Sequence, residues 1–130
     1  MSESIIRIDN VVKTFNVGQE NELEILHKIC IDIKEGEFVA IVGASGAGKS
    51  TIIGLIPRLY DVVGGCVKVA GEDVRNIDLT YLRSNIGIVT QDTYLFNGTI
   101  LENLLYAKPE ATMEEIEKAC KVANIYDFIV

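Results

Sequence analysis

Residues 43–51 constrain the fold of this chain more than any other stretch. They read Gly-Ala-Ser-Gly-Ala-Gly-Lys-Ser-Thr, and they stand between an apolar run at 38–42 and a second apolar stretch at 52–56. The spacing G-x-x-x-x-G-K-S, placed after a strand and before a helix, is typical of a loop that binds phosphate. The sequence therefore predicts a strand, a glycine-rich turn and a helix, in the order found in α/β folds.

Each residue type in this loop suits a nucleoside triphosphate. Glycines let the backbone approach the phosphates closely and aim successive N–H groups at them. We expect a helix to begin near Gly48, where its unpaired N–H groups and positive dipole end would face the anion. Lys49 would place its charge on the outer phosphates, and the Ser50 hydroxyl would bind Mg²⁺. The alternative is an ordinary glycine-rich turn with a solvated lysine.

The overall composition limits the partners of the chain. Its 130 residues are 48% hydrophobic and 24% charged, which indicates one folded domain or a large piece of a bigger one. The net charge of −7 argues against nucleic acid or an anionic membrane surface as the main partner. No apolar stretch is long enough to cross a bilayer, and the first residues lack a signal-peptide pattern. We expect the chain to stay in the cytoplasm or to be recruited to a membrane by another part.

The cysteines and the histidine give no pattern for a metal site. Cys30, Cys66 and Cys120 are far apart and include no C-x-x-C pair, so neither a zinc site nor a disulfide framework is expected. Buried or half-buried free thiols are the expected state of all three. His27 lies between Leu26 and Lys28, a position that predicts a surface imidazole on a strand and not a catalytic base.

Local patterns predict most elements of secondary structure. The alternating run at 25–34 predicts a strand with one buried face, whereas the continuous apolar run at 38–42 predicts a strand covered on both faces. Asp78, Thr99 and Thr112 are expected helix N-caps, the last two in capping boxes. The remaining expected elements are strands at 5–12, 66–70 and 86–89, and helices at 49–59, 78–83, from 99 and at 112–123.

Three stretches together resemble the first half of an ABC transporter nucleotide-binding domain of the exporter type. They are the phosphate loop at 43–51, the segment LIPRLYDVVGGCVKVAGEDVRNIDLTYLR at 55–83 and the segment IGIVTQDTYLFNGTILENL at 86–104. The resemblance implies a P-loop NTPase fold with an ABC-type ATPase core, an N-terminal antiparallel β portion and the start of the helical subdomain. On this basis residues 1–105 would form the core and β portion, and residues 106–130 would begin the helical subdomain.

The same resemblance assigns roles to single residues. Lys49 and Gln91 would be the catalytic residues, and Ser50 and Gln91 would bind the Mg²⁺ that accompanies ATP. Gln91 would also reach the attacking water, Thr51 would contact the α-phosphate, and Phe15 would stack on adenine. The complete set expected to bind the nucleotide is Phe15, Gly43, Ser45, Gly46, Ala47, Gly48, Lys49, Ser50 and Thr51.

The resemblance also implies partners for the chain. Residues 91–99 would face the transmembrane domain of an exporter at the cytoplasmic face of the membrane. A second nucleotide-binding domain would complete the site in a head-to-tail dimer.

At four positions the chain differs from the residues usual in the family. Phe15 stands where the family usually has tyrosine, and Lys13 where it usually has an apolar aromatic residue. Val62 replaces a common proline and Ala70 a common aspartate, which we read as loop variation.

The parts that catalyse hydrolysis in this family are missing from the sequence. The chain contains no LSGGQ-like stretch, no second apolar strand ending in Asp-Glu and no later switch histidine. We therefore expect it to hydrolyse ATP no faster than a Lys49→Ala variant, and to self-associate through unpaired strand edges. The main alternative is a nucleotide-binding module or degenerate subunit without turnover. A small kinase or GTPase is a third reading, which segment 86–104 disfavours.

Overall fold

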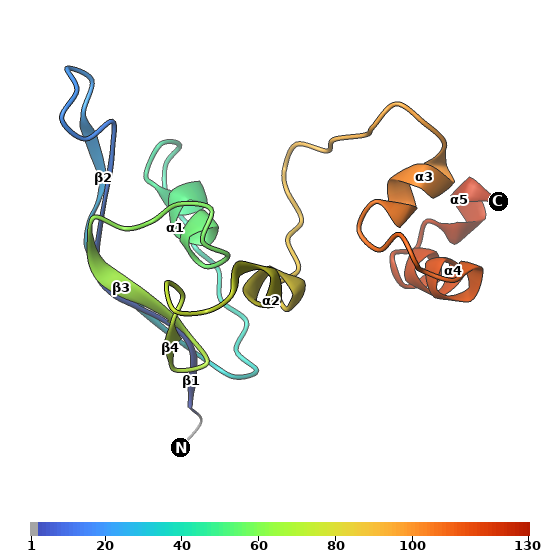
Figure 1. Cartoon of the computed structure of the whole chain (residues 1–130), viewed down its shortest axis with the longest axis horizontal. Coiled ribbons are helices and arrows are strands. Elements are labelled where there is room, and N and C mark those ends of the chain that lie inside the picture. Colours follow the sequence, from blue (N-terminus) through green and yellow to red (C-terminus); the bar gives the residue numbers. More distant parts are fainter. Residues whose placement is uncertain (1–2) are drawn as a thin grey trace. The chain divides into compact units, whose positions relative to one another are not determined.

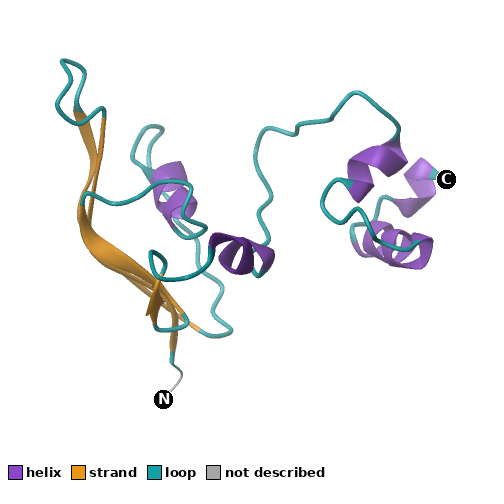
Figure 2. Cartoon of the chain, viewed as in Figure 1, coloured by secondary structure: helices purple, strands orange, loops and turns teal. Residues whose placement is uncertain are grey.

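The computed structural model describes residues 3–130, which form two compact units (Figures 1 and 2). The first unit ends at Ile88, and the second comprises Val89–Val130. The first holds β1 (Ser4–Phe15), β2 (Leu23–Lys34), α1 (Lys49–Leu55), β3 (Gly64–Val69), β4 (Glu72–Asp73) and α2 (Leu79–Ser84). The second holds α3 (Ile100–Leu105), α4 (Met113–Val122) and α5 (Tyr126–Ile129).

The strands of the first unit form one antiparallel sheet in the order β2-β1-β3-β4. Its register places Ile8 of β1 opposite Ile31 on one neighbour and Val67 on the other. The alternating pattern predicted for residues 25–34 is confirmed from Ile29 to Lys34, where the isoleucines are half-buried and the residues between them are exposed. It is broken at Leu26, which is buried next to the half-buried Ile25, because the register between β1 and β2 shifts between Leu26 and Ile29. β2 begins at Leu23, two residues before the alternation becomes visible in the sequence.

Two short helices complete the hydrophobic core of this unit. The sheet contributes buried side chains from β1, β2 and β3, and α1 and α2 add theirs from the helix side. Removing this apolar surface from water is the main force that holds the helices against the sheet. The buried core residues are Ile8, Val11, Leu26, Ile52, Leu55, Val67, Val74 and Leu82.

The strands predicted at 38–42 and 86–89 are absent, which corrects the sequence-based expectation. Both segments lack regular secondary structure, and Phe38, Val42 and Val89 are 97%, 87% and 100% exposed. A strand needs a hydrogen-bonded neighbour, and none of residues 3–130 pairs with either segment. Only Ile41 and Ile86 keep partial contact with the core. The helix expected at 49–59 also ends early, at Leu55, where the chain enters the turns around Pro57.

Helix starts are the elements that local sequence predicted best. Asp78 accepts a hydrogen bond from the backbone N–H of Tyr81 at the start of α2. Thr99 and Thr112 form full capping boxes with Glu102 and Glu115, as predicted. These contacts span three residues, so the sequence contains everything that they need.

Within the second unit, the segment before α3 is fixed by one asparagine. The Asn103 amide accepts a hydrogen bond from the N–H of Phe96 at 2.8 Å, and donates to the carbonyls of Phe96 and Thr99 at 3.0 and 2.9 Å. The Phe96 ring stacks on that of Tyr106, with 4.3 Å between centroids. Sequence reasoning did not identify this arrangement, because nothing marks an asparagine inside a helix as a partner of a preceding loop.

The isolated polar and sulfur residues mostly lie where expected. The His27 imidazole is exposed on β2 and lies 2.5 Å from the Glu24 carboxylate, as predicted for a surface residue. Cys120 is buried and Cys66 half-buried, whereas Cys30 is exposed, contrary to expectation. Cys30 falls on the solvent side of the β2 alternation, between Ile29 and Ile31. Among residues 3–130, every helix is too short or too polar to span a bilayer.

Candidate nucleotide site

The glycine-rich loop leads directly into α1, as the sequence predicted. Gly46 and Gly48 adopt left-handed backbone angles, with φ of 80° and 89°, which residues with a side chain rarely adopt. Gly48 is buried, and a Cβ added to it would lie 2.8 Å from Cδ2 of Leu26 and 3.0 Å from Cγ2 of Ile25. The start of α1 therefore rests against β2, and only glycine fits at this contact.

Lys49, the first residue of α1, directs its ammonium group back over the loop. Its Nζ donates to the carbonyl oxygens of Gly43 at 2.8 Å and Ala44 at 2.7 Å. No side chain caps this helix, and no acidic residue stands in its first turn. The loop thus combines one cation with uncapped N–H groups at a positive helix end, which is an arrangement suited to an anion.

Ser50 and Thr51 follow in the first turn of α1 and are suited to the expected metal and phosphate contacts. The Ser50 side chain is exposed. Residues 3–130 contain no cluster of three or more His, Cys, Asp or Glu side chains that could hold a metal. Mg²⁺ commonly takes one or two protein oxygens and completes its shell with phosphates and water, so a single hydroxyl fits such an ion bound together with a nucleotide.

Phe15 lies at the end of β1, opposite Leu23 of β2, and is half-buried. Its ring packs against the ring of Tyr60, with 5.4 Å between centroids and an interplanar angle of 82°. The ammonium group of Lys13 lies over the Phe15 ring, 4.7 Å from its centroid. Phe15 belongs to the same unit as the phosphate loop, but its contact with adenine stays a prediction.

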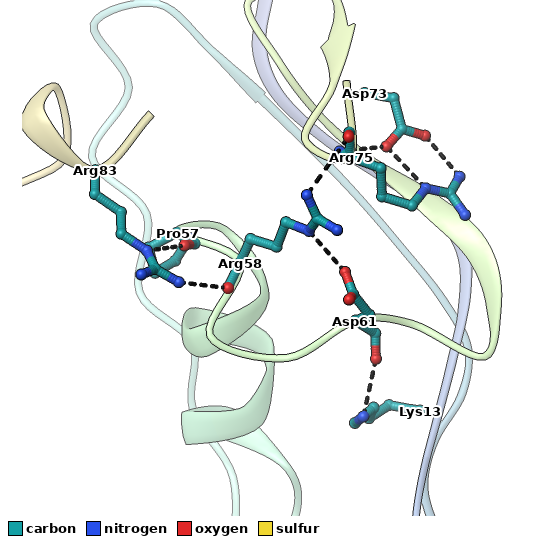
Figure 3. A network of polar contacts seen from close by, with 7 residues as sticks. All are labelled: Lys13, Pro57, Arg58, Asp61, Asp73, Arg75 and Arg83. Carbon is teal, nitrogen blue, oxygen red and sulfur yellow. Dashed lines mark hydrogen bonds and ion pairs between the residues drawn. The ribbon is translucent and has the colours of Figure 1, made fainter. Parts of the chain in front are cut away.

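A network of arginines fixes the chain between α1 and α2 (Figure 3). Arg83 of α2 donates to the carbonyls of Pro57 at 3.0 Å and Arg58 at 2.8 Å. Arg58 in turn donates to the Asp61 carboxylate at 2.8 Å, and this bond holds the pKa of Asp61 below its ordinary value. Sequence reasoning did not identify these residues, because the arginine and its carbonyl partners are about 25 positions apart.

A second carboxylate of this region is also held by an arginine. Arg75 donates to Asp73 through Nη2 at 2.7 Å and Nε at 3.0 Å, a two-pronged contact that lowers the pKa of the Asp73 carboxyl. Arg58 also donates to the carbonyl of Arg75, at 3.4 Å. The network therefore connects the end of α1 to the β3–β4 hairpin, and so stabilises the segment that follows the phosphate-binding helix.

Gln91 belongs to the second unit, in an exposed segment without regular structure. The neighbouring Thr90 hydroxyl donates to the carbonyl of Asp92 at 2.7 Å, which forms a local turn around Gln91. The segment that follows exposes large apolar side chains, with Tyr94 at 86% and Leu95 at 78%. The metal role of Gln91 and the docking role of 91–99 stay predictions.

Comparisons with known proteins place the chain in one family. The sequence model of the ABC transporter family matches residues 26–130. The putative multidrug export ATP-binding/permease protein YgaD of Bacillus subtilis (strain 168) is 45% identical over 125 residues, which are 96% of this chain and 21% of that protein. The ABC transporter aclQ of Aspergillus oryzae is 47% identical over 115 residues, or 88% of this chain and 14% of that protein.

A solved structure agrees with these relatives. The structure of a bacterial Atm1-family ABC exporter with ATP bound superposes with a TM-score of 0.85 and 42% identity, over 95% of this chain and 21% of that one. The chain thus spans about a fifth of the length of these bacterial proteins. The P-loop NTPase fold of the ABC type is confirmed by this match together with the family match. With its phosphate loop, its antiparallel β portion and its similarity to exporter ATP-binding regions, this chain belongs to the ABC transporter family.

Proposed function

We propose that this chain binds ATP with Mg²⁺ through residues 43–51, as the ATP-binding portion of an ABC exporter. The observation that carries the proposal is the position of the Lys49 ammonium group over the carbonyls of Gly43 and Ala44. An entering triphosphate would replace two neutral acceptors of the ammonium group by charged phosphate oxygens, so that attraction between opposite charges adds to each hydrogen bond. The ATP that the related exporter structure contains supports ATP as the ligand.

The other residues of the loop have separate tasks in this proposal. The N–H groups of residues 46–48 hold the β- and γ-phosphates, with Gly43 and Ser45 completing the loop around them. Thr51 contacts the α-phosphate. Ser50 supplies one oxygen to Mg²⁺, which neutralises phosphate charge when it is bound. Phe15 stacks on the base, and Gln91 approaches the metal and the water.

We further propose that the chain binds ATP but does not hydrolyse it alone. Phosphoryl transfer depends on positioning and charge stabilisation. The present sequence holds no LSGGQ-like stretch and no Asp-Glu strand to supply the remaining groups. Turnover and transport would require a second nucleotide-binding domain in a head-to-tail dimer. They would also require a transmembrane domain that contacts residues 91–99, at the cytoplasmic face of the membrane.

Equilibrium binding tests this function directly. Isothermal titration with ATP, with and without Mg²⁺, would compare the wild-type chain with Lys49→Ala and with Lys118→Ala as control. Lys118 is an exposed lysine of α4, so its variant carries the same charge change outside the loop. We expect Lys49→Ala to weaken ATP binding by about tenfold or more, since hydrogen bonds to charged groups contribute about 1.5–3 kcal/mol. Equal affinities of all three proteins would contradict the proposal.

Phosphate release separates binding from turnover. We expect the wild-type chain and Lys49→Ala to release phosphate from ATP at the same background rate in the presence of Mg²⁺. A Mg²⁺-dependent rate of the wild-type chain above that of the variant would contradict the absence of turnover while leaving ATP binding intact.

A further inference from the structure

Near the end of β1, the ammonium group of Lys13 lies beside two aromatic rings, those of Phe15 and Tyr60. The Nζ of Lys13 lies 4.7 Å from the centroid of the Phe15 ring and 5.7 Å from that of Tyr60. It also donates a hydrogen bond of 2.8 Å to the backbone carbonyl of Asp61 (Figure 3). The ammonium group is therefore held at a defined place by one carbonyl and two rings. An ammonium ion over the face of a ring is attracted by the negative charge of its π-system.

The second ring, Tyr60, connects this cluster to the phosphate-binding helix. A Cβ added to Gly54 of α1 would lie 2.8 Å from Cε2 of Tyr60, so this ring lies directly on the helix that begins at Lys49. Tyr60 and Phe15 meet edge to face. The orientation of the Phe15 ring is thus fixed from α1 through Tyr60, and from β1 through Lys13.

These contacts leave the Phe15 ring with two unequal faces. One face is covered by the Lys13 ammonium group, which its bond to Asp61 holds in place. A flat base can stack only on a face that is free, so a nucleotide that stacks on this ring has to use the face that Lys13 does not cover. Base stacking requires that the ring keep one orientation, because a ring that turns about its Cα–Cβ bond offers no constant platform.

We propose that Lys13 is a positioning residue for the base of the nucleotide: its cation holds one face of the Phe15 ring so that the base stacks on the other. This inference rests on the proposed binding of ATP at residues 43–51. It adds a residue that acts through Phe15 and does not itself touch the nucleotide. Loss of the cation would reduce the affinity for ligands that carry a base, and would leave binding of the phosphates alone unchanged.

The test compares two ligands in three proteins. ATP and inorganic tripolyphosphate, both with Mg²⁺, would be titrated into the wild-type chain, Lys13→Gln and Lys13→Arg. Glutamine removes the charge but keeps a donor for the Asp61 carbonyl, whereas arginine keeps the cation and can stack on the ring. We expect Lys13→Gln to weaken ATP binding by about threefold to tenfold, the range for losing a partly solvated cation–π contact. Lys13→Arg should restore affinity to within about twofold, with tripolyphosphate affinity constant throughout.

The same substitution made in a Phe15→Ala variant shows whether Lys13 acts through Phe15. In Phe15→Ala the ring is gone, so adding Lys13→Gln should cause no further loss of ATP affinity. An equal loss in both backgrounds, or a parallel loss for tripolyphosphate, would overturn the positioning role. Wild-type affinity of Lys13→Gln for ATP would also overturn it while leaving the proposed function intact. If ATP bound equally to the wild-type chain and to Lys49→Ala, both proposals would fail together.

Discussion

Alanine at Gly48 is expected to destabilise the chain far more than alanine at Gly46, although both glycines adopt left-handed backbone angles. The φ values are 89° and 80°, so both variants place a side chain in the same unfavourable conformation. A Cβ on Gly46 would have no heavy atom within 4 Å. A Cβ on Gly48 would lie 2.8 Å from Cδ2 of Leu26 and 3.0 Å from Cγ2 of Ile25. The two variants therefore share the cost of the backbone conformation and differ by the two steric contacts at Gly48.

The magnitudes follow from these two terms. A side chain in the left-handed region costs roughly 1–2 kcal/mol, which both variants bear. Leu26 is only 1% exposed, so its methyl group cannot move into solvent, and overpacking a filled core costs about 1–3 kcal/mol more. We expect the free energy of unfolding to fall by about 1–2 kcal/mol in Gly46→Ala and by about 2–5 kcal/mol in Gly48→Ala.

Urea denaturation followed by far-UV circular dichroism would measure both changes. A shift of the midpoint concentration with an unchanged m-value reports a change in the free energy of unfolding. A third variant, Gly48→Ala with Ile25→Ala, removes one of the two clashing methyl groups. In a double-mutant cycle this change should recover part of the loss, as expected for residues in contact. Losses in Gly46→Ala and Gly48→Ala that agree within about 0.5 kcal/mol would refute the steric argument, because only the shared backbone cost would then remain.

Three further predictions test other parts of the structure. Gly65→Ala should lower the urea midpoint more than Gly71→Ala. Both glycines have positive φ, but a Cβ on Gly65 would collide with backbone carbonyls of β1, whereas a Cβ on Gly71 would have no atom within 4 Å. Equal shifts of the midpoint would contradict this. Thr112→Ala should destabilise α4 by about 1 kcal/mol, seen as faster amide exchange in its first turn, whereas Thr112→Ser should keep the cap. The pKa of Asp73 is lowered by its hydrogen bonds to Arg75, so its stabilising effect exists above the unfolded pKa and is lost as pH falls through the lower folded value. Asp73→Asn should therefore destabilise the chain at neutral pH, with a deficit that shrinks below about pH 4, and a deficit independent of pH would contradict the pairing.

The sequence by itself determined the features whose partners lie within a few positions. The phosphate loop and the start of α1 follow from the spacing of glycines before Lys49, and the capping boxes at Thr99 and Thr112 close within three residues. The alternation from Ile29 to Lys34 of β2 indicated which of these side chains turn inward, because successive residues of a strand face opposite sides. Each of these signals is local, so one short chain segment contains all the residues that the feature needs.

Only the tertiary structure decided the features that depend on distant partners. Residues 38–42 are as apolar as a central strand, yet they form none, because strand pairing requires a neighbour that none of residues 3–130 provides. Three contacts join segments far apart in the chain: the close approach of Gly48 to Leu26, the bonds of Arg83 to the turn after α1, and the position of Lys13 and Phe15 beside Tyr60. Such contacts arise when the sheet and helices pack together, and no local pattern of residues specifies which distant atoms will meet.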